Sequence, residues 1–208
     1  MILMYSGLRL GEFIPLTWND IDFESHTIRV NKTAVFLDGK SKPNDHKTLK
    51  SGYRNKAIVR DYMKSESGNR TVKIPQKLVE YLKAQPRDNI LVCPSAHGGL
   101  MTESAWKALW KSYVKELNNK YGKKVKISKS KFTHASPMTI SPITAHWLRH
   151  TFATLLYLSG VDVLTAKDQL GCADVTTTLN IYTHLDQGFK DKNIAKLDDY
   201  LNNQFVLA

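Results

Sequence analysis

Two arginines, a histidine and a tyrosine in this chain are of the types needed to cut and rejoin a phosphodiester. Arg9 lies near the start, His146 and Arg149 stand three residues apart, and Tyr182 follows downstream. Guanidinium groups bind phosphate through forked donors, and a phenol becomes a nucleophile where a base or cations favour its ionised form. With a pKa of about 10, only about one phenol in a thousand is ionised near neutral pH, a cost of about 4 kcal/mol. The four side chains together predict phosphoryl transfer to a tyrosine.

The histidine and the second arginine are predicted to share one helix face, because residues three apart are neighbours on a helix surface. Thr144 is a candidate N-cap for a helix over 144–158, so His146 falls in the first turn, where free N–H groups favour an anion. The opposite side carries the apolar residues expected to face the core: Leu148, Phe152, Leu155 and Leu156. An ordinary solvated face is the alternative for the pair taken alone.

A zinc site is the other chemistry that this helix has to be tested for, since His146 and His150 stand four residues apart. Trp147 occupies the place where a zinc protease needs its glutamate, and no nearby carboxylate or cysteine offers a third ligand. We therefore expect no metal, and we predict that His150 is a buried, hydrogen-bonded neighbour of the site.

The elements that must position these residues are predicted to form an α+β fold that is predominantly helical, with a small antiparallel sheet near the N-terminal part packed on a helical body. Residues 2–17 have helical spacing interrupted by two glycines. β-branched and aromatic residues predict strands over 21–23, 27–35, 55–63 and 70–74, with a surface loop over 37–51. Helices are expected over 76–84, 102–121, 144–158, 163–170, 175–182 and 193–205.

Charge and composition predict a nucleic-acid partner. The chain has 30 Lys plus Arg against 19 Asp plus Glu, a net charge of +11, and its basic residues recur over 40–77 and 107–131 rather than in a tail. Two widely spaced cysteines, Cys93 and Cys172, indicate a reducing compartment, which predicts the cytoplasm. No signal peptide or membrane span is expected.

Five ordered motifs resemble the tyrosine recombinase (phage integrase) family. They are Gly7-Leu8-Arg9-Leu10-Gly11-Glu12, Lys64-Ser65-Glu66-Ser67-Gly68-Asn69-Arg70-Thr71-Val72, His146-Trp147-Leu148-Arg149-His150, Leu170-Gly171, and Ile181-Tyr182-Thr183-His184. The resemblance implies that Tyr182 attacks the phosphate, forms a 3′-phosphotyrosyl link and releases a 5′-hydroxyl, without metal, ATP or other cofactor. Arg9, His146 and Arg149 would then stabilise the charge that builds up on the phosphate.

Three further residues take roles from the same resemblance. Lys64 precedes Ser-Gly-Asn-Arg-Thr-Val and matches the family's general-acid lysine on a β-hairpin, with Lys50 or Lys73 as fallbacks. Glu12 either fixes Arg9 or a neighbouring side chain, or is a surface charge. Cys172 stands where the family usually carries a His or Trp that donates to the phosphate, and a thiol is only a weak donor.

The resemblance also sets expectations for organisation and partners. Residues 1–208 are expected to form a single catalytic domain, a fragment without the family's first helices and DNA-clamping domain. The expected partners are a double-stranded DNA attachment site, a homo-tetramer on DNA, and DNA-bending or excision factors of a mobile genetic element or a chromosome-dimer system. A type IB topoisomerase-like DNA-relaxing enzyme and a non-cleaving DNA-binding protein of recombinase ancestry remain alternatives.

Overall fold

A computed structural model describes residues 1–37, 56–61, 69–123, 138–172 and 174–176 of the chain. Two short helices, α1 (Ile2–Ser6) and α2 (Leu10–Phe13), begin it, and a 3-10 turn over Trp18–Asp20 leads into the strands. The chain passes from α1 to α2 through Gly7, whose φ of 66° is in the left-handed region that favours glycine. A Cβ at Gly7 would lie 2.5 Å from Cδ1 of Phe152, so the glycine also lets a distant helix approach closely.

The strands form two small antiparallel sheets. In one, β2 (Thr27–Val30) lies between β1 (Ile21–Asp22) and β5 (Arg70–Lys73). In the other, β3 (Lys32–Leu37) pairs with β4 (Lys56–Asp61). The predicted single strand over 27–35 is therefore wrong in one respect: Val30 pairs with Arg70 but Lys32 pairs with Asp61, so the strand divides at Asn31 and changes partner.

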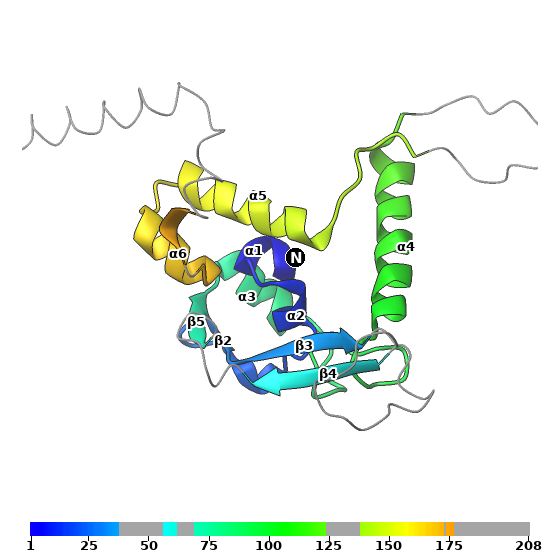
Figure 1. Cartoon of the computed structure of the whole chain (residues 1–208), viewed down its shortest axis with the longest axis horizontal. Helices are drawn as coiled ribbons and strands as arrows, with labels where there is room; N and C mark the ends of the chain where they lie inside the picture. Colours follow the sequence, from blue (N-terminus) through cyan, green and yellow to red (C-terminus); the bar gives the residue numbers. More distant parts are fainter. Residues whose placement is uncertain (38–55, 62–68, 124–137, 173, 177–208) are drawn as a thin grey trace, which may run out of the picture.

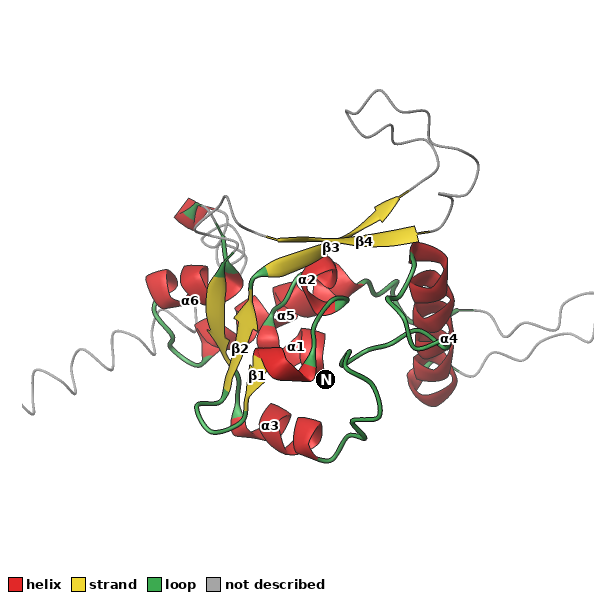
Figure 2. Ribbon diagram, turned by 90° about the horizontal axis from the view of Figure 1, so that it is seen from below, coloured by secondary structure: helices red, strands yellow, loops and turns green. Residues whose placement is uncertain are grey.

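The four longer helices of the described part are α3 (Gln76–Lys83), α4 (Glu103–Tyr121), α5 (Ala145–Leu158) and α6 (Val163–Leu170). Figure 1 shows α5 lying across α1, α6 beside β5, and α4 standing apart. Figure 2 shows the β3–β4 ribbon on the side of α2 opposite to α3. The mixed architecture confirms the predicted α+β class, and the predicted helices over 76–84, 102–121, 144–158 and 163–170 are confirmed within about one residue at each end.

The main core joins the N-terminal helices to the sheet and α3. Leu8, Ile28, Val72 and Leu78 are at most 1% exposed within it. α4 joins this core through Trp106, whose ring lies edge-on to Phe13 with centroids 6.3 Å apart. A second cluster joins α5 to α6, and it consists of Phe152, Ala153, Leu170 and Cys172.

Several sequence predictions fall outside the described residues. These are most of the loop over 37–51, the candidate acids Lys64 and Lys50, the nucleophile candidate Tyr182, and the helices expected over 175–182, apart from its first residues, and over 193–205. Much of the predicted basic surface also falls there. None of the helices in the described part is long and apolar enough to cross a lipid bilayer.

Candidate active site

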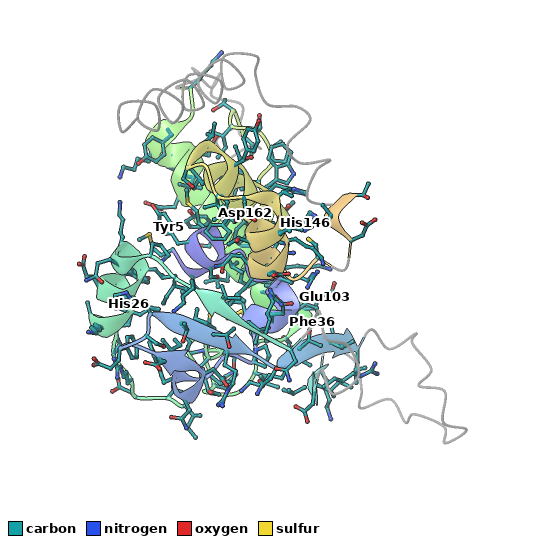
Figure 3. All side chains as sticks on the ribbon, turned by 90° about the vertical axis from the view of Figure 1, so that its left-hand side faces the viewer. Tyr5, His26, Phe36, Glu103, His146 and Asp162 are labelled. Carbon is teal, nitrogen blue, oxygen red and sulfur yellow. The ribbon has the colours of Figure 1, made fainter. Side chains whose placement is uncertain are left out.

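A pocket of about 460 Å³ brings together Arg9, His146 and Arg149. Arg9 comes from the start of α2, and His146 and Arg149 come from the first and second turns of α5. Arg9 precedes His146 by 137 positions in the sequence. The other walls are supplied by β3 and α4, including Phe36, Glu103, Lys107 and Trp110. Figure 3 shows His146 on the same side of the molecule as Glu103 and Phe36.

The start of α5 confirms the predicted N-cap and the predicted place of His146. The Thr144 hydroxyl accepts a hydrogen bond of 3.3 Å from the backbone N–H of Trp147, which caps the helix and leaves His146 in the first turn. Arg149 is only 6% exposed, so it is not part of a solvated face. Leu155 is 39% exposed, and its predicted burial is wrong.

Arg149 is held by the ends of two other helices. Its Nη1 donates to the carbonyl of Gly7 at 2.6 Å, and its Nη2 donates to the carbonyl of Leu170. The Cys172 thiol lies 3.6 Å from the same Nη2. Burial lowers the pKa of Arg149, and the positive charge of Arg9 lowers it further. The second arginine is thus fixed by backbone carbonyls beside the pocket.

Arg9 is held by two different acceptors. Its Nη1 donates to Oε1 of Glu12 at 2.9 Å, and its Nη2 donates to the carbonyl of Gly171 at 2.7 Å. The backbone N–H of Arg9 also donates to Oε2 of Glu12 at 2.8 Å. Its side chain keeps 43% of its surface exposed, so the guanidinium reaches the pocket while its hydrogen bonds to Glu12 and Gly171 fix its orientation.

Glu12 is a buried member of this cluster and not a surface charge. Its carboxylate is fully buried and accepts hydrogen bonds from Arg9 and, at 3.0 Å for each oxygen, from the fork of Arg70. Burial alone would raise the pKa of Glu12, but the hydrogen bonds and charges of Arg70 and Arg9 outweigh it and lower that pKa. The carboxylate is therefore ionised and bridges two arginines.

His150 is exposed, so the prediction that it is buried is wrong. It stands one turn after His146, and their rings meet edge to face with centroids 4.4 Å apart. Both lie on the exposed stripe of α5, whereas Arg149 and Phe152 lie on the buried stripe. Partial burial, His146 and Arg149 lower the pKa of His150. Within the described ranges, no three His, Cys, Asp or Glu side chains are grouped as metal ligands.

The pocket does not contain every predicted residue. Lys64 and Tyr182 lie outside the described ranges, and Cys172 touches Arg149 from the second core cluster. The fallback Lys73 donates from Nζ to the carbonyl of Ser25 at 3.2 Å, at the end of β5 away from Arg70. A larger apolar pocket of about 510 Å³, between α1, α3 and α4, contains none of the predicted site residues.

Sequence reasoning missed Arg70, which the quoted hairpin motif contained without a role. Its signal in the sequence is a charged residue in phase with Val72, the buried residue of a strand. Sequence reasoning also gave no role to the carbonyls of Gly7, Leu170 and Gly171, because the residue type carries no information about which carbonyl accepts a side chain.

Known proteins resemble this chain over most of its length. The model of the phage integrase family matches residues 1–188. The chain is 28% identical to a XerC-like tyrosine recombinase of Caldanaerobacter subterraneus subsp. tengcongensis, covering 93% of this chain and 46% of the relative. It is 27% identical to the ICEBs1 integrase of Bacillus subtilis, covering 96% of this chain and 48% of that protein. The chain thus spans about half the length of these relatives.

Solved structures show the same fold. The Tn1549 transposon integrase in complex with circular intermediate DNA superposes with a TM-score of 0.64 at 22% identity, over 94% of this chain and 57% of that one. The XerA recombinase superposes with a TM-score of 0.54 at 23% identity, over 94% of this chain and 55% of that one. At these identities the likeness is one of fold. Because the family model spans nine-tenths of its length, the chain belongs to the phage integrase family.

Proposed function

We propose that the chain is the catalytic part of a site-specific DNA recombinase or integrase that joins DNA through a 3′-phosphotyrosyl intermediate. The observation that carries this proposal is the pocket in which Arg9, His146 and Arg149 meet in a chain of the phage integrase family. The printed names of the relatives, a tyrosine recombinase and an integrase, and the DNA bound to the Tn1549 integrase support it.

In the proposed reaction the hydroxyl oxygen of Tyr182 attacks the phosphorus, and the bond to the 5′ oxygen breaks. Tyr182 gives up its proton, for which His146 is the candidate acceptor, and the leaving 5′ oxygen takes a proton from Lys64. Arg9 and Arg149 bind the non-bridging oxygens, where negative charge increases in the transition state. A 5′-hydroxyl of the second strand then attacks the phosphotyrosine and frees Tyr182, so the phosphoester bond energy is kept.

The partners follow from the same proposal. The substrate is a double-stranded DNA attachment site, the active assembly is a homo-tetramer on DNA, and DNA-bending or excision factors assist it. The net charge of +11 favours a phosphate-rich partner. Residues 1–208 would act as one catalytic domain, in the cytoplasm. Sedimentation on attachment-site DNA, with and without residues after Lys192, tests the assembly.

Covalent trapping tests the reaction. The protein is incubated with nicked duplexes that carry candidate attachment sites, from which the short 5′-hydroxyl fragment diffuses away after cleavage. SDS-resistant protein–DNA adducts are then counted for the wild type, for Tyr182→Phe and for the control Tyr81→Phe. The control also removes one tyrosine hydroxyl, but on α3, away from the candidate active site. The longest natural chain that contains this sequence is assayed in parallel.

The proposal expects adducts with the wild type and with Tyr81→Phe, and none with Tyr182→Phe. DNA binding without adducts from either length of chain would overturn it and favour a non-cleaving DNA binder. Relaxation of supercoiled plasmids that carry no attachment site would favour a type IB topoisomerase-like enzyme instead.

A further inference from the structure

Arg70 occupies a position in β5 where an apolar residue is expected. It is the first residue of the strand and pairs with Val30, and two positions later Val72 pairs with Ile28. Because side chains alternate along a strand, Arg70 lies on the same face as Val72, and Val72 and Ile28 are 0% exposed. The Arg70 side chain is 8% exposed, so a positive charge is built into the core side of the sheet.

The guanidinium of Arg70 binds two elements at once. Its Nη1 and Nη2 donate to the two carboxylate oxygens of Glu12 in α2, each at 3.0 Å. Its Nε donates to the carbonyl of Gln169, at the end of α6, at 3.4 Å. The flat face of the guanidinium lies against Gly171, because a Cβ there would be 2.5 Å from Cζ of Arg70.

Arg9 is held by the same two elements that Arg70 binds, α2 and the end of α6. Arg9 donates to Oε1 of Glu12, the same oxygen that accepts from Nη1 of Arg70. Its second guanidinium bond goes to the carbonyl of Gly171, the residue against which Arg70 packs. Each group that orients the Arg9 guanidinium is therefore itself in contact with Arg70.

We propose that Arg70 is a positioning residue for the pocket: it orients Arg9 by holding Glu12 and the Gln169–Gly171 turn in place. Without the fork of Arg70, the Glu12 carboxylate would have free acceptors and would draw the Arg9 guanidinium into a two-bond pair, away from the Gly171 carbonyl. Small displacements of a group that binds the reacting atoms are costly in rate. This inference rests on the proposed function for its kinetic test only.

The test compares Arg70→Lys with Arg29→Lys in the longest natural chain. Lysine keeps the charge but loses the fork and the flat surface. Arg29 is the matched control, because it lies on the neighbouring strand, opposite Thr71, and its side chain is 62% exposed. We expect the single-turnover cleavage rate of Arg70→Lys to fall about 10- to 100-fold while DNA affinity stays within about twofold. Arg29→Lys is expected to cleave at the wild-type rate.

A double-mutant cycle separates positioning from general support of the fold. If Arg70 orients Arg9 through Glu12 and the Gln169–Gly171 turn, then Arg70→Lys costs less cleavage rate in a Glu12→Gln background than in the wild type, because only its hold on the turn is left to lose. If the two fold-losses in cleavage rate multiply, each substitution keeps its full effect in the presence of the other. That result would overturn the proposal. Equal losses of rate in Arg70→Lys and Arg29→Lys would overturn it as well.

A spectroscopic readout keeps this inference distinct from the proposed function. The side-chain Nε–H signal of Arg9 is assigned by NMR through Arg9→Lys, and its exchange with water is measured in the wild type and in Arg70→Lys. We expect faster exchange and a shifted signal in Arg70→Lys, and neither in Arg29→Lys. An unchanged Arg9 signal would overturn the positioning role, even if no adduct ever forms; a changed signal without adducts would count against the proposed function alone.

Discussion

The guanidinium of Arg149 donates a hydrogen bond of 2.6 Å to the carbonyl oxygen of Gly7, 142 residues earlier in the chain. Its other terminal nitrogen binds the carbonyl of Leu170, and the adjacent carbonyl of Gly171 accepts from Arg9. The turn between α1 and α2 and the end of α6 therefore meet at two arginines. Backbone carbonyls cannot shift independently of their helices, so they give the two charges a defined spacing.

Arg149→Lys is expected to lower the cleavage rate about 100- to 1,000-fold, the usual cost of losing a transition-state donor. A lysine carries one charged nitrogen and cannot replace a planar fork between the Gly7 and Leu170 carbonyls. Single-turnover cleavage of a nicked duplex measures the effect. Arg87→Lys is the control, since Arg87 lies over the ring of Phe23, 4.5 Å from its centroid, and not in the pocket. Wild-type cleavage by Arg149→Lys would contradict the expectation.

Glu12→Gln is expected to destabilise the protein by about 3–5 kcal/mol at neutral pH, because it removes one partner of a buried ion pair. The stability difference between wild type and variant should also depend on pH. The pKa of Glu12 is lowered from its ordinary value of 4.5, so its contribution to stability is present above that pH and is lost as the pH falls through the lowered value. The gap between wild type and variant should therefore narrow on acidification, as measured by denaturant unfolding at a series of pH values.

Asp20→Asn is the matched control for Glu12→Gln. Burial alone would raise the pKa of Asp20, but Lys32 and Thr17 outweigh it and lower that pKa, so Asp20 also contributes stability that acid removes. Its nearest charged partner is Lys32, at 2.6 Å, outside the pocket. Both variants should have a flatter stability profile in acid, but only Glu12→Gln should slow cleavage. A cleavage defect of equal size in Asp20→Asn would show that the rate follows stability alone.

The helices and the site's outline could be predicted from sequence because their signals are local. Thr144 caps α5 as predicted, and α6 ends at Leu170 before a glycine with φ of 65°. The boundary between β2 and β3 is harder to predict, because the two strands are joined through Asn31 in one run of β-forming residues. A change of pairing partner within such a run depends on distant strands, which the local pattern does not contain.

The details of the site depended on long-range contacts. The resemblance points to Arg9 and Arg149, but each of them also donates to a backbone carbonyl at the end of another helix, which any residue type could supply. The sequence around Glu12 fits either a positioning role or a surface charge, because the contact that decides between them is with Arg70, 58 positions away. The burial of His150 was predicted wrongly because its spacing from Arg149 does not indicate which stripe of α5 faces the core.

Gly171→Ala is expected to cost stability and to slow cleavage. Its φ of 65° is strained for alanine by about 1–2 kcal/mol, and the new Cβ would displace the Arg70 guanidinium. Gly98→Ala is the control, because its φ is 79° but the tip of Asn89, at 3.3 Å, is the nearest atom that a Cβ would meet. Thermal unfolding and cleavage rates are compared for both. Equal losses of stability and unchanged cleavage would mean that only the backbone strain matters.

Cys172→His is expected to leave the cleavage rate equal or higher. The thiol is a weak donor, and its 3.6 Å contact with Arg149 adds little to an Nη2 that already binds the Leu170 carbonyl. An imidazole supplies a stronger N–H donor at a position where the resemblance implies a His or Trp. Cys172 is only 7% exposed, so thermal unfolding of the variant shows whether the larger ring is accommodated.

Cys172→Ser and Cys172→Val separate donor strength from packing at this position. Serine is a stronger donor of similar size, so it should cleave at least as fast as the wild type, whereas valine fills the space without a donor and should be no faster. A large loss of cleavage in Cys172→His with unfolding unchanged would overturn the expectation. It would mean that the site has adapted to the thiol contact with Arg149, so that an imidazole no longer fits beside the guanidinium.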